Sequence, residues 1–260
     1  MTMKMEETQL EVMLQDTLDR IKTNSLPDED KKEYQCEKCK DEEWIYNEDT
    51  NTAWPCTCRE AKKYQRILSK SGISNIFLQK TFKNFEVKTQ RTKKARDTAV
   101  KYVQEFEQIK GTQNNSIAFL GQVGSGKTHL SIAIANELMN RGIGVKYMQY
   151  RDDIMKIKQT AGDDFNYARE INQYKNASVL MIDDLLKGAV NNNVVNSADI
   201  RAMFEIINYR YLKGAPIIIS SEYYTDQLLE FDEGVGSRII HMCKGHIVEL
   251  EGADLNYRLN

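Results

Sequence analysis

The sequence predicts an α/β fold in which helices cover both faces of a mostly parallel β-sheet. From residue 76 onward, short apolar segments alternate with longer segments of helical periodicity, which is the order expected of a parallel sheet. A glycine-rich motif lies between one of these strands and the helical pattern that follows it. An acidic pair ends another strand, at the edge where α/β sheets hold ligands.

Five segments are predicted as strands of this sheet. They are Ile117–Leu120, Val145–Met148, Val179–Ile182, Pro216–Ser220 and His246–Leu250. Upstream, apolar residues between Leu10 and Ile21 repeat at helical spacing, and residues 22–33 are rich in charge, which is typical of a solvated linker. We therefore expect a small N-terminal module over residues 1–75 and one main α/β domain over residues 76–260.

The overall composition gives no sign of a nucleic-acid or membrane protein. The formal net charge is -2, with 28% charged and 41% hydrophobic residues, so any DNA contact is expected to be local. Apolar runs such as Ile217–Ile219 are far shorter than a membrane span, and the first residues are acidic, without an apolar signal region. We expect a cytoplasmic protein with no membrane partner.

A phosphate-binding loop is predicted at Gly121–Thr128, which reads G-x-x-x-x-G-K-T between a strand and a helical pattern. Its glycines let the backbone wrap around an anion, and the amides at the start of the helix point at the phosphates. A glycine-rich turn with a chance lysine is the alternative. The residues expected to contact the nucleotide here are Gly121, Gly124, Ser125, Gly126, Lys127, Thr128 and His129.

The side chains of this region predict binding of ATP and magnesium. Lys127 is expected to bridge the β- and γ-phosphates, and the Thr128 hydroxyl to supply one Mg²⁺ ligand. The buried strand pattern Val179–Ile182 ends in Asp183 and Asp184. We expect Asp183 to hold the magnesium ion or its water, and Asp184 to orient or deprotonate the attacking water. A strand followed by an acidic helix cap is the alternative.

Two further features lie in the last third of the chain. Ser221 and Glu222 follow the apolar strand Pro216–Ser220, where polar groups can reach the γ-phosphate. Gly236-Ser237-Arg238 places an arginine near a helix. Because an arginine can stabilise transferring phosphoryl charge in trans, Arg238 can act on the nucleotide of a neighbouring subunit. A surface salt bridge is the alternative for Arg238.

Four cysteines form two close pairs, Cys36-x-x-Cys39 and Cys56-x-Cys58, separated by sixteen residues. This spacing predicts a four-cysteine zinc site that closes a small module and supplies much of its folding free energy. Redox-active thiols or an iron–sulfur cluster are the alternatives. Cys243 lies far away and is interpreted as structural. Acidic residues predominate inside the module, which favours a protein contact or a weak single-strand contact.

Taken together, these motifs resemble the DnaC/DnaI family of replicative helicase loaders, especially its phage and prophage members. The resemblance runs from the cysteine module to the C-terminus and includes Thr81–Phe85, the Gly121–Thr128 loop, the Asp183-Asp184 pair and Gly236-Ser237-Arg238. It implies an AAA+ core with the sheet order 5-1-4-3-2 and an arginine finger at Arg238. It also implies that the N-terminal module grips a hexameric helicase.

The same resemblance assigns further residues. It places Phe82 near the adenine, together with Phe85, and a helix around Asp153–Lys158 near single-stranded DNA, where Lys156 and Lys158 are either backbone contacts or a solvated face. It assigns Arg258 as a second γ-phosphate sensor. Where relatives often have asparagine after the fourth strand, this chain has Ser-Ser-Glu. The water-sensing role therefore falls to Ser221 or Glu222.

The sequence thus predicts an ATPase that uses ATP, Mg²⁺ and Zn²⁺ to load a DnaB-type replicative helicase onto single-stranded DNA. It is expected to self-associate through its AAA+ domain. The alternatives are an IstB-like ATPase helper of a transposase, a non-catalytic adaptor switched by nucleotide, and a small-molecule kinase, for which no acceptor-binding element or arginine-rich lid is found. Selective binding to a helicase or to a transposase separates the first two.

Overall fold

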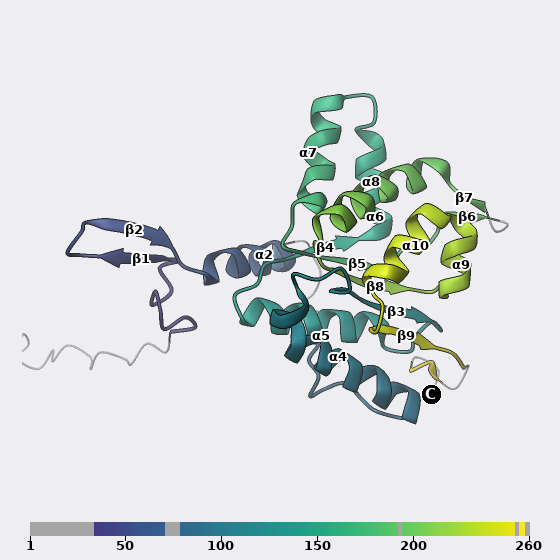
Figure 1. Ribbon diagram of the computed structural model, residues 1–260, viewed down its shortest axis with the longest axis horizontal. Helices are drawn as coiled ribbons and strands as arrows, with labels where there is room; N and C mark the ends of the chain where they lie inside the picture. The colour runs from purple at the N-terminus through teal and green to yellow at the C-terminus, as the bar shows by residue number, and fades with distance from the viewer. Residues whose placement is uncertain (1–33, 71–78, 192–193, 253–254, 258–260) are drawn as a thin grey trace, which may run out of the picture. The chain divides into compact units, whose positions relative to one another are not determined.

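The structure of the protein is a computed structural model (Figure 1) that describes residues 34–70, 79–191, 194–252 and 255–257. The chain divides into two compact units, Met1–Glu42 and Glu43–Asn260. The helix predicted before Ile21 lies outside the described residues, as does Arg258. The domain boundary predicted between residues 75 and 76 stays a prediction, because residues 71–78 also lie outside them.

A parallel β-sheet forms the centre of the second unit. In spatial order its strands are β4 (Val145–Gln149), β5 (Val179–Asp183), β8 (Ile217–Ser221), β3 (Ile117–Gly121) and β9 (Ile247–Leu250). All neighbouring pairs are parallel. Numbered along the chain and read from the β9 edge, this is the predicted order 5-1-4-3-2. The five predicted strands are confirmed, with ends that differ by one residue.

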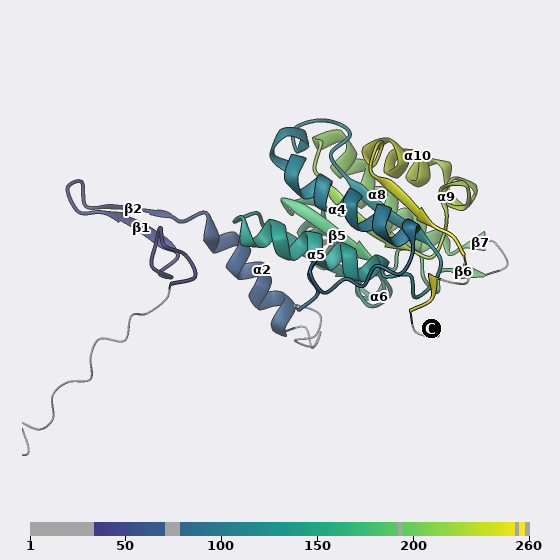
Figure 2. The same ribbon diagram turned by 90° about the horizontal axis from the view of Figure 1, so that it is seen from below.

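Helices pack on both faces of the sheet (Figures 1 and 2). Helices α4 (Gln90–Ile109) and α5 (Lys127–Asn140) share one apolar cluster with the sheet, and α2 (Cys58–Lys70) packs against α5 and β4. The helices whose buried side chains join the cluster on the other face are α6 (Tyr150–Gln159), α7 (Asp164–Lys175), α8 (Ser197–Lys213), α9 (Thr225–Phe231) and α10 (Glu233–Met242). The result is a three-layer arrangement.

The strand sequences explain this layering. In β3, Ile117 and Phe119 join the α4 and α5 cluster, whereas Ala118 and Leu120 join the cluster on the other face, and all four are fully buried. Successive side chains of a strand point to opposite faces, so a sheet covered on both sides needs apolar residues at every position. The uninterrupted apolar runs in the sequence are therefore the direct signature of a doubly covered sheet.

Two short hairpins lie outside this sheet. Strands β1 (Trp44–Asn47) and β2 (Thr52–Pro55) pair antiparallel in the segment between the two cysteine pairs. Strands β6 (Val190–Asn191) and β7 (Val194–Val195) form a second antiparallel pair before α8. In the part of the chain that the structure describes, none of the helices has the length and apolar character needed to span a bilayer.

Candidate functional site

The carboxyl ends of three neighbouring strands bring a group of polar side chains together. Because β8 lies between β5 and β3, the residues that end β5 and β8 meet the helix that follows β3. Asp183 Oδ1 accepts hydrogen bonds from Thr128 Oγ1 at 2.8 Å and from Ser220 Oγ at 2.5 Å. Asp183 Oδ2 accepts one from the Tyr147 hydroxyl at 3.1 Å. The structure thus brings together Thr128 and Asp183, the two residues predicted to hold magnesium.

Asp183 is a buried carboxyl, with 7% of the residue exposed. Burial raises its pKa, and hydrogen bonds from Ser220, Thr128 and Tyr147 oppose that rise. Burial and the neighbouring Asp183 carboxylate raise the pKa of Tyr147, so its phenol stays protonated and donates. Hydroxyl and carboxylate oxygens are the ligands that Mg²⁺ prefers. The donor set at Thr128 and Asp183 therefore fits a magnesium site.

The phosphate loop has the backbone that its glycines predict. Gly121, Gly124 and Gly126 have φ angles of 99°, 76° and 88°, in the left-handed region that side chains disfavour. A Cβ on Gly126 would lie 2.6 Å from Cε2 of Phe85. The buried Ser125 hydroxyl donates to the Gln122 carbonyl at 2.7 Å and holds the loop closed. The loop is a fixed cradle that a larger residue at Gly126 would break.

Lys127 lies near the end of this loop and is the first residue of α5. Its ammonium donates to the carbonyls of Gly121 at 2.7 Å and Gln122 at 2.6 Å. Burial lowers the pKa of Lys127 to about 8, and nearby carboxylates oppose the shift. The cation is therefore held at the loop itself, next to the amides that would receive a phosphate.

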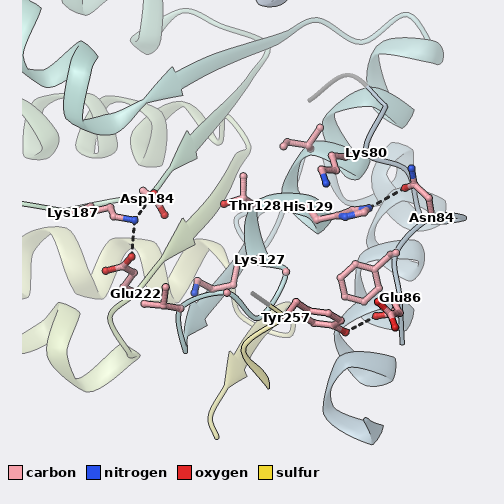
Figure 3. Close-up of a pocket in the computed structure, with 15 residues that line it drawn as sticks. Lys80, Asn84, Glu86, Lys127, Thr128, His129, Asp184, Lys187, Glu222 and Tyr257 are labelled. Atoms are coloured by element: carbon pink, nitrogen blue, oxygen red, sulfur yellow. Dashed lines mark hydrogen bonds and ion pairs between the residues drawn. The ribbon is translucent and has the colours of Figure 1, made fainter. Parts of the chain in front are cut away.

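A pocket of about 450 Å³ opens over the loop. Lys127 and Thr128 lie in its middle, with Lys80, Asn84, Glu86 and Tyr257 toward one end and Asp184, Lys187 and Glu222 toward the other (Figure 3). The residues that line it are Lys80, Asn84, Phe85, Glu86, Val123, Gly124, Gly126, Lys127, Thr128, His129, Ile132, Asp184, Lys187, Glu222 and Tyr257. The lining holds the rings of Phe85, His129 and Tyr257 and the cations of Lys127 and Lys187, which suits a ligand with an apolar ring and an anionic tail.

At the first end, His129 contacts two oxygen atoms and the ring of Phe85. Its Nε2 lies 2.9 Å from the Thr81 carbonyl and 3.1 Å from Asn84 Oδ1, and its ring packs edge-on to Phe85 with centroids 5.2 Å apart. Burial lowers the pKa of His129. Phe85 lines the pocket, whereas Phe82, which was predicted to be near the adenine, is half-buried against the core on the α4 side. The role of Phe82 stays a prediction.

At the second end, Lys187 lies between two carboxylates. Its Nζ is 2.9 Å from Asp184 Oδ2 and 2.7 Å from Glu222 Oε1. The Ser221 hydroxyl is fully buried and donates to the Leu185 carbonyl at 2.9 Å. Of the two residues predicted to sense water, Glu222 thus lines the pocket and Ser221 lies behind it.

Arg238 lies on α10 and is absent from the pocket lining formed by the described residues. Its guanidinium donates to Asn208 Oδ1 at 3.0 Å and to the Gly234 carbonyl at 2.7 Å, and it lies over the Phe204 ring. These partners hold the side chain in place on the helix.

The two lysines assigned to single-stranded DNA lie on α6 and are ion-paired. Lys156 Nζ is 2.8 Å from Asp153 Oδ1, and Lys158 Nζ is 2.5 Å from Asp199 Oδ1. Asp199 is buried and also accepts a hydrogen bond from Tyr150. Lys158 is therefore tied to the core, while Lys156 stays at the exposed surface. Their contact with DNA stays a prediction.

The four paired cysteines converge. The sulfur atoms of Cys36, Cys39, Cys56 and Cys58 all lie within 4.8 Å of one another. A tetrahedral Zn–S₄ site with bonds of about 2.3 Å needs sulfurs roughly 3.8 Å apart. Cys58 is the first residue of α2, where the helix dipole favours a thiolate. The cluster thus offers the donor set and approximate spacing of a structural zinc site.

Several pocket residues have no motif in the sequence. Lys80 and Tyr257 come from segments at opposite ends of the domain and meet only in the fold, whereas Asn84 lies in the Thr81–Phe85 motif but had no role assigned to it. Behind the pocket lining, Ser220 had a weak signal, because it is a polar side chain that follows an apolar run in its strand, whereas Tyr147 lies in a strand that also holds Lys146 and Gln149 and had none. Such a residue at the carboxyl end of a strand is a reasonable functional candidate.

Comparisons with known proteins agree with this site. The family model of IstB-like ATP binding proteins matches residues 32–260. Phage-like element PBSX protein XkdC of Bacillus subtilis (strain 168) is 38% identical over 238 residues, which are 88% of each chain. Replicative helicase loader DnaC of Escherichia coli (strain K12) is 32% identical over 126 residues, covering 48% of this chain and 50% of DnaC.

The fold has a counterpart among solved structures. Replication initiator DnaA bound to AMPPCP and single-stranded DNA superposes with a TM-score of 0.54 at 25% identity, over 68% of this chain and 51% of DnaA. The family match spans both the cysteine pairs and the phosphate loop, and the relative XkdC matches over most of the chain. This chain therefore belongs to the IstB/DnaC-like family of AAA+ ATP-binding proteins.

Proposed function

We propose that this protein is a Mg²⁺-dependent ATPase that loads a DnaB-type hexameric helicase onto single-stranded DNA at the start of replication. The observation that carries the proposal is the presence, in one chain, of a four-cysteine cluster and a complete phosphate site. The matched relative DnaC is named a replicative helicase loader, and the DnaA structure contains single-stranded DNA. Both likenesses favour work on replicating DNA.

The chain's own residues divide the ATPase work. The loop amides and Lys127 bind the phosphates, and Thr128 and Asp183 hold Mg²⁺, which neutralises charge on the phosphates when bound. Asp184 orients or deprotonates the attacking water. Glu222 is better placed than Ser221 to position that water, because it lines the pocket beside Asp184.

Arg238 acts on the nucleotide of a neighbouring subunit. Its guanidinium is held by Asn208 and Gly234 and does not line its own pocket, which supports a role in trans. Hydrolysis then requires self-association through the AAA+ domain, because the charge that develops on the phosphoryl group is stabilised by the next subunit. ATP favours the assembly and its grip on DNA, and hydrolysis releases the loader.

The cysteine cluster holds Zn²⁺ and shapes the module that binds the helicase. Its thiolates fix the chain on both sides of the β1–β2 hairpin, and a segment this short buries little apolar surface. Exposed aromatic side chains on that hairpin, Tyr46 and Trp54, suit a protein partner.

A second candidate function is supported by the family model, whose description is IstB-like ATP binding protein. An ATPase helper of a transposase shares the same nucleotide site. The test is competitive binding of the purified chain to a DnaB-type helicase and to a transposase, each with and without ATP. Preference for the helicase supports the loader, and preference for the transposase replaces it with the helper function.

A further inference from the structure

The charged end of the pocket contains an ammonium held by two carboxylates. Lys187 Nζ donates to Asp184 Oδ2 at 2.9 Å and lies 2.7 Å from Glu222 Oε1 (Figure 3). Lys187 comes from the turn after β5, and Glu222 follows β8, the neighbouring strand. All three side chains line the pocket that Lys127 and Thr128 also line. The trio thus lies on the phosphate side of the site.

The turn that carries Lys187 is strained and firmly anchored. Asp184 and Leu186 have φ angles of 56° and 64°, which residues other than glycine rarely adopt. Leu185 and Leu186 are buried, and the Leu185 amide donates to the Ser220 carbonyl at 2.9 Å. Such strain persists only where the surroundings fix the backbone, and it concentrates at functional sites. The two buried leucines therefore fix the backbone of Lys187 beside the pocket.

The charges at this end require a cation for an anionic ligand to bind. Asp184 and Glu222 together would repel a terminal phosphate, since like charges in a partly desolvated pocket are costly. Partial burial lowers the pKa of Lys187, but Glu222 and Asp184 raise it by more, so the net shift is upward and the ammonium stays charged. A lysine ammonium has three donors, and the two carboxylates use two of them. The third remains for a phosphate oxygen.

We propose that Lys187 recognises the terminal phosphate of the nucleotide and gives this site its preference for triphosphate over diphosphate. With diphosphate, Lys187 stays between Asp184 and Glu222; with triphosphate, its third N–H bonds a γ-phosphate oxygen and the two carboxylates keep the ammonium in position. The inference rests on the ATP-binding part of the proposed function and not on the helicase. It makes Lys187 a second phosphate-binding cation besides Lys127.

The test compares the dissociation constants of ADP and of the non-hydrolysable analogue AMPPCP, both with Mg²⁺, by calorimetry. Lys187→Met removes the charge, Lys187→Arg keeps it, and Lys110→Met is a matched control, because Lys110 pairs with Glu107 three residues earlier and neither residue lines the pocket. We expect wild type and Lys110→Met to share one ratio of the two constants. Lys187→Met lowers the preference for AMPPCP about tenfold, as for loss of a charge-assisted bond, and Lys187→Arg restores much of it.

Each other outcome is decisive. The role of Lys187 is overturned if Lys187→Met leaves the ratio of the two dissociation constants unchanged. It is also overturned if a variant that melts like wild type loses affinity for both nucleotides equally. If Lys187→Met fails to fold, the uncharged polar variant Lys187→Gln and the double variant Lys187→Met/Glu222→Gln, which is neutral at both positions, give the same ratio test. A wild type that binds neither nucleotide overturns the proposed function as well, whereas failure of helicase loading alone leaves the ratio test unaffected.

Discussion

Asp183 illustrates how single residues prepare this site. A carboxylate this buried loses most of its hydration, and hydrogen bonds from Thr128, Ser220 and Tyr147 replace part of it. Ser220 has a double role, since its hydroxyl also accepts the Asp184 amide at 3.0 Å. The two acidic residues are thus oriented by one side chain of the adjacent strand.

Ser220→Ala is expected to raise the Mg²⁺ concentration that ATP turnover requires. The variant loses a hydrogen-bond donor to Asp183 and leaves the Asp184 amide without this acceptor. Because loss of a hydrogen bond to a metal ligand weakens metal binding, the Mg²⁺ concentration for half-maximal ATP turnover should rise about tenfold. Ser221→Ala loses a bond to the Leu185 carbonyl and should change stability more than magnesium dependence. Equal magnesium curves for wild type and Ser220→Ala would contradict this role.

Gly126→Ala tests the shape of the phosphate loop. The φ of 88° disfavours any side chain, and the new Cβ would meet the Phe85 ring at 2.6 Å. We expect loss of nucleotide binding and a fall in unfolding free energy of about 1–2 kcal/mol from the left-handed backbone alone. Gly111→Ala is the control, because nothing lies within 4 Å of its Cβ position. Calorimetry and thermal melting measure both effects, and normal ATP affinity in Gly126→Ala would be inconsistent with a rigid loop.

At the scale of elements, the strands and the phosphate loop were predictable because their signals are local. β3, β5 and β8 each begin with a continuous apolar run, and only their ends shifted by one residue, where hydrogen bonding and not hydrophobicity sets the limit. The sheet order came from the resemblance to a family. Periodicity alone does not specify which strands become neighbours.

The remainder of the site depends on tertiary neighbours. Lys187 and Glu222 are 35 residues apart in sequence (222 − 187) and meet only because β5 and β8 are adjacent. Tyr257 reaches the loop through its amide, which donates to the Gly124 carbonyl at 3.0 Å. No short motif encodes such contacts. Phe85 and Phe82 could not be ranked either, because burial of each ring depends on how its segment packs against the rest of the domain.

The cysteine cluster predicts a chelation experiment. Purified protein should hold about one zinc ion per chain, and removing it should expose the thiols of Cys36, Cys39, Cys56 and Cys58 to a disulfide reagent. Cys243 should react only on unfolding, because it is fully buried and burial raises the pKa of its thiol. Zinc content and thiol titration measure this. Visible absorption from bound iron would instead support a cluster of iron and sulfur.

Helix α10 predicts complementation between two inactive variants. Arg238→Ala keeps its own nucleotide pocket, and Lys127→Ala keeps its Arg238. Each alone should hydrolyse ATP at least about tenfold more slowly than wild type. A mixture should regain measurable turnover, because the arginine of one subunit reaches the ATP of the other. Mixtures that stay inactive, while Arg238→Ala melts normally and binds ATP, would contradict action in trans.

At the scale of the whole molecule, nucleotide chemistry and a cysteine cluster are combined in one chain whose net charge is only -2. Such a chain has no general attraction to DNA, so binding to single strands should depend on the ATP-bound assembly and not on overall charge. We predict that the helicase is the main binding partner of the protein and that ATP binding determines when the protein binds single-stranded DNA. Family membership is compatible both with a helicase loader and with a transposase helper. The identity of the protein partner therefore distinguishes the two functions.

The most direct measurement is helicase loading onto closed circular single-stranded DNA, followed together with ATP turnover, for wild type, Lys127→Ala and Cys36→Ser. Loading by wild type with ATP, and its loss in both variants, is the result we predict, because one change removes phosphate binding and the other a cysteine of the cluster. A wild type that hydrolyses ATP yet neither binds nor loads a DnaB-type helicase would contradict the loader function and favour the transposase helper.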